Sequence, residues 1–215
     1  MYLSDREILK ALNTKQLIIE PRPNRKDIGA TSVDLHLDSV DKARVWNMDA
    51  FRETTNALGA ELHELRIGKF DYRKFSNKYT MPPPENNDAK NLTFKRGAQI
   101  IVRPRGFVLW QTREIVGTHE KTGKLICFID GKSTKARTGL LVHLTAPTIH
   151  AKWNGHVTLE IANLGPFDFV LEAGDVVAQI TVARISSIPL YNSKVSESNT
   201  IGQVNVTGRP NGIAQ

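Results

Sequence analysis

The stretch "GHVTLEIAN", residues 155–163, decides the fold because its side chains alternate between apolar and polar along most of its length. Its apolar and polar members separate onto the two faces of an extended chain: Val157, Leu159 and Ile161 against His156, Thr158 and Glu160. A period of two is the pattern of a β-strand with one buried face. The stretch therefore predicts a strand that presents Glu160 on the face opposite the core.

Other short apolar stretches surround this strand and are separated by glycine, proline and polar residues. They are "TSVDLHL" (31–37), "FKRGAQIIVRPRGFVLWQT" (94–112), "KLICFIDG" (124–131), "LLVHLTA" (140–146) and "PFDFVLEAGDVVAQITVARI" (166–185). Short strands at this spacing are typical of a sandwich or barrel. The sequence therefore predicts a mainly β domain over 1–190.

Helical signals are few. Ser4 and Glu7 form a capping box, and apolar residues follow at helical spacing, which predicts a helix over 5–13. In the excursion 45–90, the stretch "NALGAELHELRI" (56–67) fits a helix, and "MPPPENNDAKN" (81–91) a loop. The tail 191–215 is rich in Ser, Asn, Gly and Thr, and we expect a ligand or a neighbouring subunit to order it.

The charge balance points to an anionic partner. The net charge is +7 and the pI about 9.6, but the basic residues are scattered and accompany no nucleic-acid motif. We therefore expect a nucleotide or phosphate metabolite rather than nucleic acid. No apolar run approaches the roughly 20 residues of a membrane span, and the N-terminus has no signal-peptide pattern. The lone Cys127 excludes a disulfide framework and fits the reducing cytoplasm.

Two features could carry chemistry. Glu160 is a mid-strand carboxylate, and a partly buried carboxylate can act as a general acid or base; the residue pattern alone favours a solvated glutamate. The glycine-led stretch "GKSTKAR" (131–137) could cradle phosphate or form a polar turn. It is not a Walker A loop, because Ile126 occupies the position of the first glycine. One cysteine cannot supply the two that zinc base deaminases require.

Several motifs resemble the dCTP deaminases of the dUTPase-like superfamily. The stretch "DGKSTKARTGLLVHLTAPTIHAKWNGHVTLEIAN" (130–163) is similar to their central block, which reads G-R-S-S-x-x-R-x-G, V-H-x-T-A, I-D-x-G-W-x-G and L-E. Matching pieces occur in the same order elsewhere: "LSDREILKAL" (3–12), "WQTREIV" (110–116), "AGDVVAQITV" (173–182) and "PLYN" (189–192). The resemblance is weakest in 45–90.

The resemblance implies a distorted jelly-roll, a β-clip dUTPase-like barrel with a short N-terminal helix and few additional helices. It also implies a homotrimer with active sites between subunits. The implied reaction converts dCTP and water to dUTP and ammonia without zinc, with Mg²⁺ on the triphosphate and dTTP as a candidate inhibitor.

The resemblance assigns roles to individual residues. Glu160 corresponds to the general base, and Ser133 and Arg137 orient the water and stabilise developing charge. The backbone at Thr145 and Ala146 holds the pyrimidine. The expected contacts to the rest of the nucleotide are Lys132, Ser133 and Thr134 on phosphate, Gln179 in the later motif, and Tyr191 and Gln203 from the tail.

Three departures from the family pattern leave alternatives open. The family's lid lysine has no clear counterpart in the tail, where Ser198 or Asn199 falls near its position and Lys194 lies a few residues earlier. Lys132 stands where arginine is usual, so the bidentate fork is lost. His150 stands where the pattern has aspartate; it could contact the deoxyribose 3′-hydroxyl or only fill a turn. A bifunctional deaminase–diphosphatase or a dUTPase would need an acid to position water, which His150 argues against. A nucleotide-binding regulator without turnover is the alternative from another class.

Overall fold

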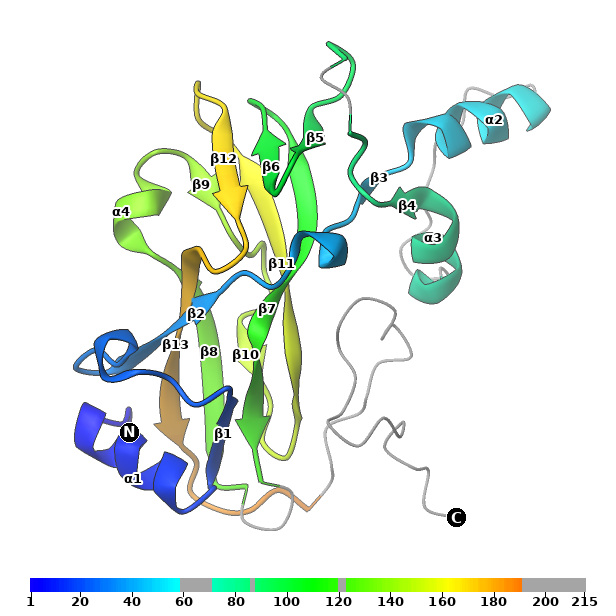
Figure 1. The fold of residues 1–215 in the computed structure, drawn as a ribbon. Helices are drawn as coiled ribbons and strands as arrows, with labels where there is room; N and C mark the ends of the chain where they lie inside the picture. Colours follow the sequence, from blue (N-terminus) through cyan, green and yellow to red (C-terminus); the bar gives the residue numbers. More distant parts are fainter. Residues whose placement is uncertain (59–70, 86–87, 120–122, 191–215) are drawn as a thin grey trace.

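The computed structural model describes residues 1–58, 71–85, 88–119 and 123–190. Two four-stranded antiparallel sheets form the body of the molecule (Figure 1). The first has the order β1-β7-β11-β9. Its strands are β1 (Leu17–Glu20), β7 (Phe107–Thr118), β11 (Asn154–Asn163) and β9 (Leu140–Leu141).

The second sheet has the order β10-β8-β13-β2. Its strands are β10 (Thr148–Ile149), β8 (Leu125–Gly131), β13 (Val176–Arg184) and β2 (Ser32–His36). One cluster of buried apolar side chains draws on both sheets, with Trp110, Leu159 and Ile161 from the first and Leu35 and Ile180 from the second, all fully buried. This shared core makes the two sheets the layers of one sandwich.

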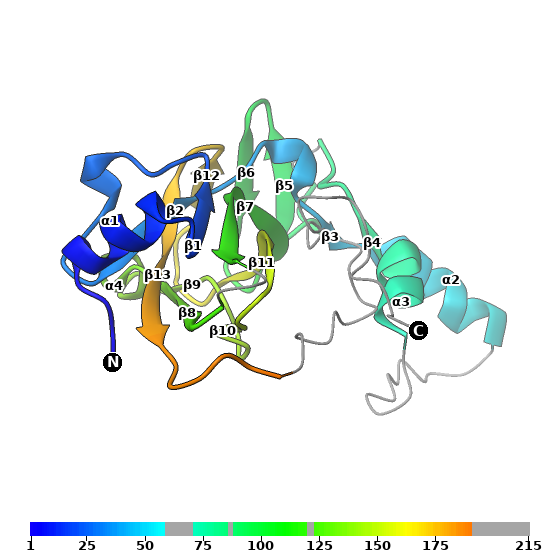
Figure 2. The same ribbon diagram turned by 90° about the horizontal axis from the view of Figure 1, so that it is seen from below.

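Two smaller sheets extend from this body. One has the order β12-β6-β5, from β12 (Phe169–Glu172), β6 (Gln99–Val102) and β5 (Thr93–Arg96). The other pairs β3 (Val45–Trp46) with β4 (Thr80–Met81) and carries α2 (Met48–Leu58) and α3 (Tyr72–Tyr79). Seen from below, α2 and α3 lie beyond β3 and β4, on the side of the molecule away from α1 and α4 (Figure 2).

The remaining helices are short. They are α1 (Asp5–Asn13), α4 (Ser133–Ala136) and two 3₁₀ turns, Arg25–Asp27 and Val40–Lys42. The predicted helix 5–13 has the observed bounds, and its capping box between Ser4 and Glu7 is present. In the described residues no helix is long and apolar enough to cross a membrane.

The predicted mainly β class is confirmed, but the described strands form separate sheets rather than one closed barrel. The alternation in β11 is confirmed, since Leu159 and Ile161 are buried and Glu160 is half-buried on the opposite face. The predicted strand 140–146 is too long, because only Leu140–Leu141 pair with β11. Beyond Leu141 the chain no longer pairs with β11, and the backbone N–H of Leu144 instead donates a hydrogen bond to the side chain of Glu160.

The excursion 45–90 differs most from the prediction. Its first helix, α2, begins at Met48, eight residues before the predicted start at 56; residues 59–67 of that prediction lie outside the described residues. The described parts of 82–91 form no helix or strand, in agreement with the predicted loop. The second helix, α3, was missed, although aromatic residues at helical spacing mark it: Tyr72, Phe75 and Tyr79.

Candidate active site

Glu160 lies between two neighbouring segments of the chain. On one side its register partner is Leu109 of β7. On the other side the chain leaves β9 and passes the carboxylate, where the Leu144 backbone N–H donates a 3.3 Å hydrogen bond to Glu160 Oε2. One carboxylate oxygen is therefore held by the backbone. The next two residues, Thr145 and Ala146, are exposed beside this contact.

Glu160 is neither fully buried nor freely solvated, because β11 buries its apolar face and the chain around Leu144 covers part of the polar face. An oriented, half-buried carboxylate can accept a proton from a water molecule placed next to it.

The predicted phosphate stretch begins at the end of β8. Lys132 is the N-cap of α4, a single helical turn, whereas the residue pattern alone predicted a glycine loop or a polar turn. Lys132 Nζ lies 2.6 Å from Asp34 Oδ1 and 3.4 Å from Gln179 Oε1. Adjacent strands bring these three side chains together, because β13 pairs with both β2 and β8 and places Gln179 opposite Asp34.

The other residues of this stretch face outward. Ser133, Thr134 and Arg137 are exposed, and within the described residues no hydrogen bond or ion pair joins them to Glu160. After α4 the chain turns at Gly139, whose φ is +96° and where a Cβ would collide with the backbone of Gly165. Both views place α4 and the helices α2 and α3 on opposite sides of the molecule (Figures 1 and 2).

His150 is exposed in the turn that follows β10, where its carbonyl accepts a 3.3 Å hydrogen bond from the Trp153 N–H. In the part of the chain that the structure describes, no hydrogen bond or ion pair connects His150 with Lys132 or Glu160. Tyr191 and Gln203, the residues expected from the tail, lie outside the described residues.

The structure thus brings the predicted site residues together in two groups. One group is Glu160 with the backbone at 144–146, and the other is Lys132 with Gln179 beside α4. Sequence reasoning missed Asp34, which belongs to the second group, and Tyr72, whose pKa responds to Glu160. Burial raises the pKa of the Tyr72 phenol first, and the charge of Glu160 raises it further.

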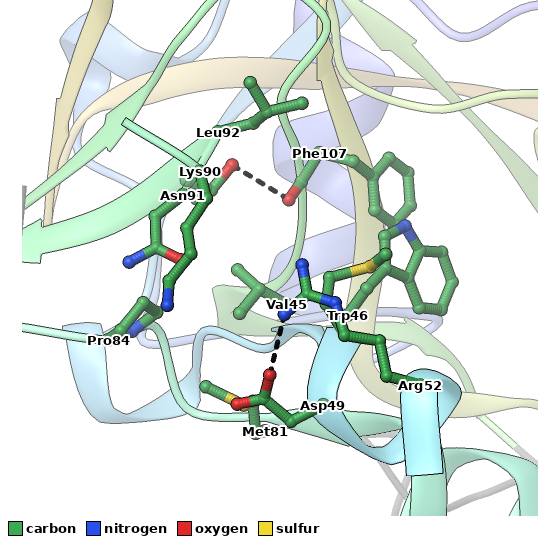
Figure 3. A pocket seen from close by; sticks show the side chains of 12 residues that line it. Val45, Trp46, Asp49, Arg52, Met81, Pro84, Lys90, Asn91, Leu92 and Phe107 are labelled. Carbon is green, nitrogen blue, oxygen red and sulfur yellow. Dashed lines mark hydrogen bonds and ion pairs between the residues drawn. The ribbon is translucent and has the colours of Figure 1, made fainter. Parts of the chain in front are cut away.

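Two further features do not belong to this site. A cavity of about 210 Å³ opens between the excursion and the β5–β7 region, where Trp46 lies flat on Phe107 and Arg52 pairs with Asp49 (Figure 3). None of the predicted site residues lines it. Cys127 is fully buried, and burial raises the pKa of its thiol to about 12, so it is no nucleophile at neutral pH.

Potential metal ligands do not gather in the part of the chain that the structure describes. No group of three or more His, Cys, Asp or Glu side chains there is placed to hold a metal ion. The carboxylate of Asp34 is already paired with Lys132.

Comparison with known proteins shows the family. The profile of the dCTP deaminase-like family matches residues 2–185, so the chain belongs to that family. It is similar to a dCTP deaminase from Marinomonas sp., 31% identical over 86% of this chain and 84% of the relative. It is also similar to a dUMP-forming dCTP deaminase from Methanosphaera stadtmanae, 27% identical over 94% of this chain and 89% of the relative.

A solved structure has the same fold. The crystal structure of 2′-deoxycytidine 5′-triphosphate deaminase from Agrobacterium tumefaciens matches with a TM-score of 0.55 at 16% identity. The match covers 86% of this chain and 49% of that one. The predicted resemblance and jelly-roll class are confirmed by these matches.

Proposed function

We propose that this protein is a dCTP deaminase that hydrolyses dCTP to dUTP and ammonia in the cytoplasm, with Glu160 as the general base. The observation that carries the proposal is the half-buried carboxylate of Glu160, held by the Leu144 N–H in a chain whose relatives are named dCTP deaminases. The net charge of +7 suits a triphosphate substrate.

The chemistry follows from the position of the carboxylate. Water is a poor nucleophile towards C4 of cytosine, so a base must remove a proton as the C–O bond forms. The Leu144 N–H fixes one oxygen of Glu160 and leaves the other to receive that proton. Glu160 passes this proton to N3 of the ring as water adds to C4. It then takes the remaining proton from the new C4 hydroxyl and delivers it to the amino group, so that the C4–N bond breaks, ammonia leaves and the C4 carbonyl forms.

In this proposal the other predicted residues orient the water, stabilise developing charge and bind the substrate. Ser133 and Arg137 orient the water and stabilise the charge that develops on the ring. Thr145 and Ala146, next to the Leu144 contact, hold the pyrimidine through their backbone. Lys132 and Thr134, with Gln179 beside Lys132, hold the triphosphate, and Mg²⁺ arrives bound to the phosphate oxygens.

The arrangement of one protomer supports an active site shared between subunits. Ser133 begins α4 and Arg137 is its C-cap, and both are exposed, so they are available to a neighbouring subunit. Figures 1 and 2 place α4 on the opposite side of the molecule from α2 and α3. We therefore infer that Glu160 of one subunit acts with α4 of the next in a homotrimer. A cyclic assembly of this kind gives each subunit one site.

The direct test is to incubate purified protein with dCTP and Mg²⁺ and to resolve ammonia, dUTP and dUMP over time. We expect ammonia and dUTP in equal amounts. If dCTP raises the melting temperature but no ammonia appears, the protein is a nucleotide-binding regulator and the proposal is wrong.

A further inference from the structure

The turn between β10 and β11 holds Lys152 in a backbone conformation that favours glycine. Its φ is +67°, in the left-handed region where residues with a side chain are strained. The family pattern I-D-x-G-W-x-G has glycine at this position, where the chain reads "IHAKWNG" (149–155). A strained residue of this kind persists only when its surroundings hold it in place. The contacts of Lys152 therefore point to what the side chain is for.

Contacts to other segments hold Lys152 in this conformation. Its backbone N–H donates a 2.7 Å hydrogen bond to the hydroxyl of Thr118, which is fully buried at the end of β7. Its side chain runs close over Gly123, where a Cβ would lie 2.8 Å from Lys152 Cγ. The ammonium group then donates a 2.7 Å hydrogen bond to the carbonyl of Pro189. The side chain thus ties the turn to the segment that follows β13.

This segment, 186–190, has little else to hold it. Figure 1 shows it, in orange, running below β8 and β10. Within the described residues, one hydrogen bond joins 186–190 to the rest of the chain, and it is the bond from Lys152 to Pro189. Ile188 and Leu190 are exposed, so burial of apolar side chains adds little. Lys152 is therefore the main contact that fixes the path of the chain here.

The fixed carbonyl lies just before the tail. Tyr191, which the family resemblance places on the nucleotide, follows two residues after Pro189. Two extended residues span at most about 7 Å, so a chain fixed at Pro189 enters the tail from a defined point. Without this anchor, the chain would lose more conformational freedom when the tail binds nucleotide, and binding would be weaker.

We propose that Lys152 is a positioning residue for the C-terminal tail, because its ammonium group fixes the Pro189 carbonyl and thereby places Tyr191 for contact with the nucleotide. This inference rests on the proposed deaminase function. In this role Lys152 touches neither the reacting atoms nor the phosphates, so it affects KM for dCTP and leaves kcat nearly unchanged. The strained φ is a consequence of the anchor, since glycine would adopt the turn without strain but could not reach Pro189.

The test compares Lys152→Met with Lys124→Met in the full chain. Methionine at position 152 keeps an apolar side chain over Gly123 and the same backbone strain, but it removes the ammonium group. Lys124, next to Gly123, is exposed, and within the described residues its side chain makes no hydrogen bond or ion pair, so it controls for the loss of one positive charge. We expect KM of Lys152→Met to rise by roughly fivefold at nearly unchanged kcat, because one hydrogen bond from a charged group is lost. Lys124→Met should match the wild type.

Two further variants separate positioning from stability. Lys152→Gly relieves the strain at φ +67° but removes the anchor. We expect it to melt at or above the temperature of the wild type and still to show the higher KM of Lys152→Met. Lys152→Arg keeps a charged donor and should hold KM nearer to the wild-type value. If Lys152→Gly has the wild-type KM, the positioning role is overturned.

A double variant tests the route through the tail. If Lys152 acts by placing Tyr191, then Lys152→Met should add little to the KM of Tyr191→Ala. An equal rise of KM with and without Tyr191→Ala overturns the proposal. If the wild type releases no ammonia from dCTP, the deaminase proposal fails on its own, and Lys152 is tested by isothermal titration with dCTP. Equal dissociation constants for the wild type and Lys152→Met then overturn the positioning role, and absence of dCTP binding overturns both.

Discussion

Lys132 and Asp34 form an ion pair of 2.6 Å between residues that are 98 positions apart in the sequence. The pair joins the end of β8 to β2, and both side chains are mostly shielded from solvent. Asp34 therefore fixes the ammonium group of Lys132 next to Gln179 before any nucleotide binds. Because its ammonium group is already held in place, the Lys132 side chain loses little conformational freedom when it binds phosphate.

Lys132→Met should weaken the binding of dCTP. The change removes the positive charge that is held beside Gln179. We expect KM to rise by roughly tenfold, because the loss of one charge-assisted hydrogen bond to phosphate has about this effect. Lys135→Met, on the same helical turn, is the control and should leave KM near the wild-type value. Lys132→Arg should keep binding, because a guanidinium also pairs with phosphate. Equal KM values for the two methionine variants would remove Lys132 from the phosphate site.

The product should remain dUTP, without release of pyrophosphate. Cleavage between the α- and β-phosphates needs a base that positions water, and the exposed imidazole of His150 differs in reach and direction from the aspartate of the family pattern. A phosphorus NMR time course with dCTP and with dUTP measures this. Since some relatives are named dUMP-forming, steady pyrophosphate from either substrate would make the protein bifunctional.

Activity should depend on Mg²⁺ and not on zinc. The triphosphate binds Mg²⁺ through its own oxygens, so removal of Mg²⁺ with EDTA should raise KM, and added Mg²⁺ should restore it. Extensive dialysis against a zinc-selective chelator should leave the rate unchanged. Stoichiometric zinc in elemental analysis, together with loss of turnover when it is removed, would contradict this prediction.

Inactive subunits should restore one another's activity. If Glu160 and Arg137 act in one site from different subunits, trimers reassembled from equal amounts of Glu160→Gln and Arg137→Ala contain some sites with both native residues. Random assortment gives up to about a quarter of the wild-type activity. Light scattering of the mixture should give the mass of a trimer. Complete inactivity of the mixed trimers, or an active monomer, would contradict the shared site.

The sequence predicts those parts of the fold that depend on local patterns. The capping box gives the bounds of α1, and the alternation in β11 gives the face of Glu160, because both signals lie within a few residues. The early end of β9 could not be predicted, since the chain there turns to let the Leu144 N–H reach Glu160.

The sequence alone could not predict which residues far apart in the chain meet in the site, because such contacts depend on how the strands and helices pack. The contact between Lys132 and Asp34 depends on the register of β13 with two other strands. The position of α3 depends on the contact of Phe75 with Trp46, which in turn stacks on Phe107 of β7. Periodicity identifies the elements, but it does not determine which of them pack together.

The most direct test of the account is the rate of ammonia release from dCTP by Glu160→Gln. The amide keeps the size of the side chain and can still accept the Leu144 hydrogen bond, but it cannot take a proton from water. We expect the rate to fall by roughly 10²–10⁴-fold, as for loss of a general base, while isothermal titration still shows dCTP binding. A variant that keeps more than about a tenth of the wild-type rate would contradict the assignment of Glu160 as the base.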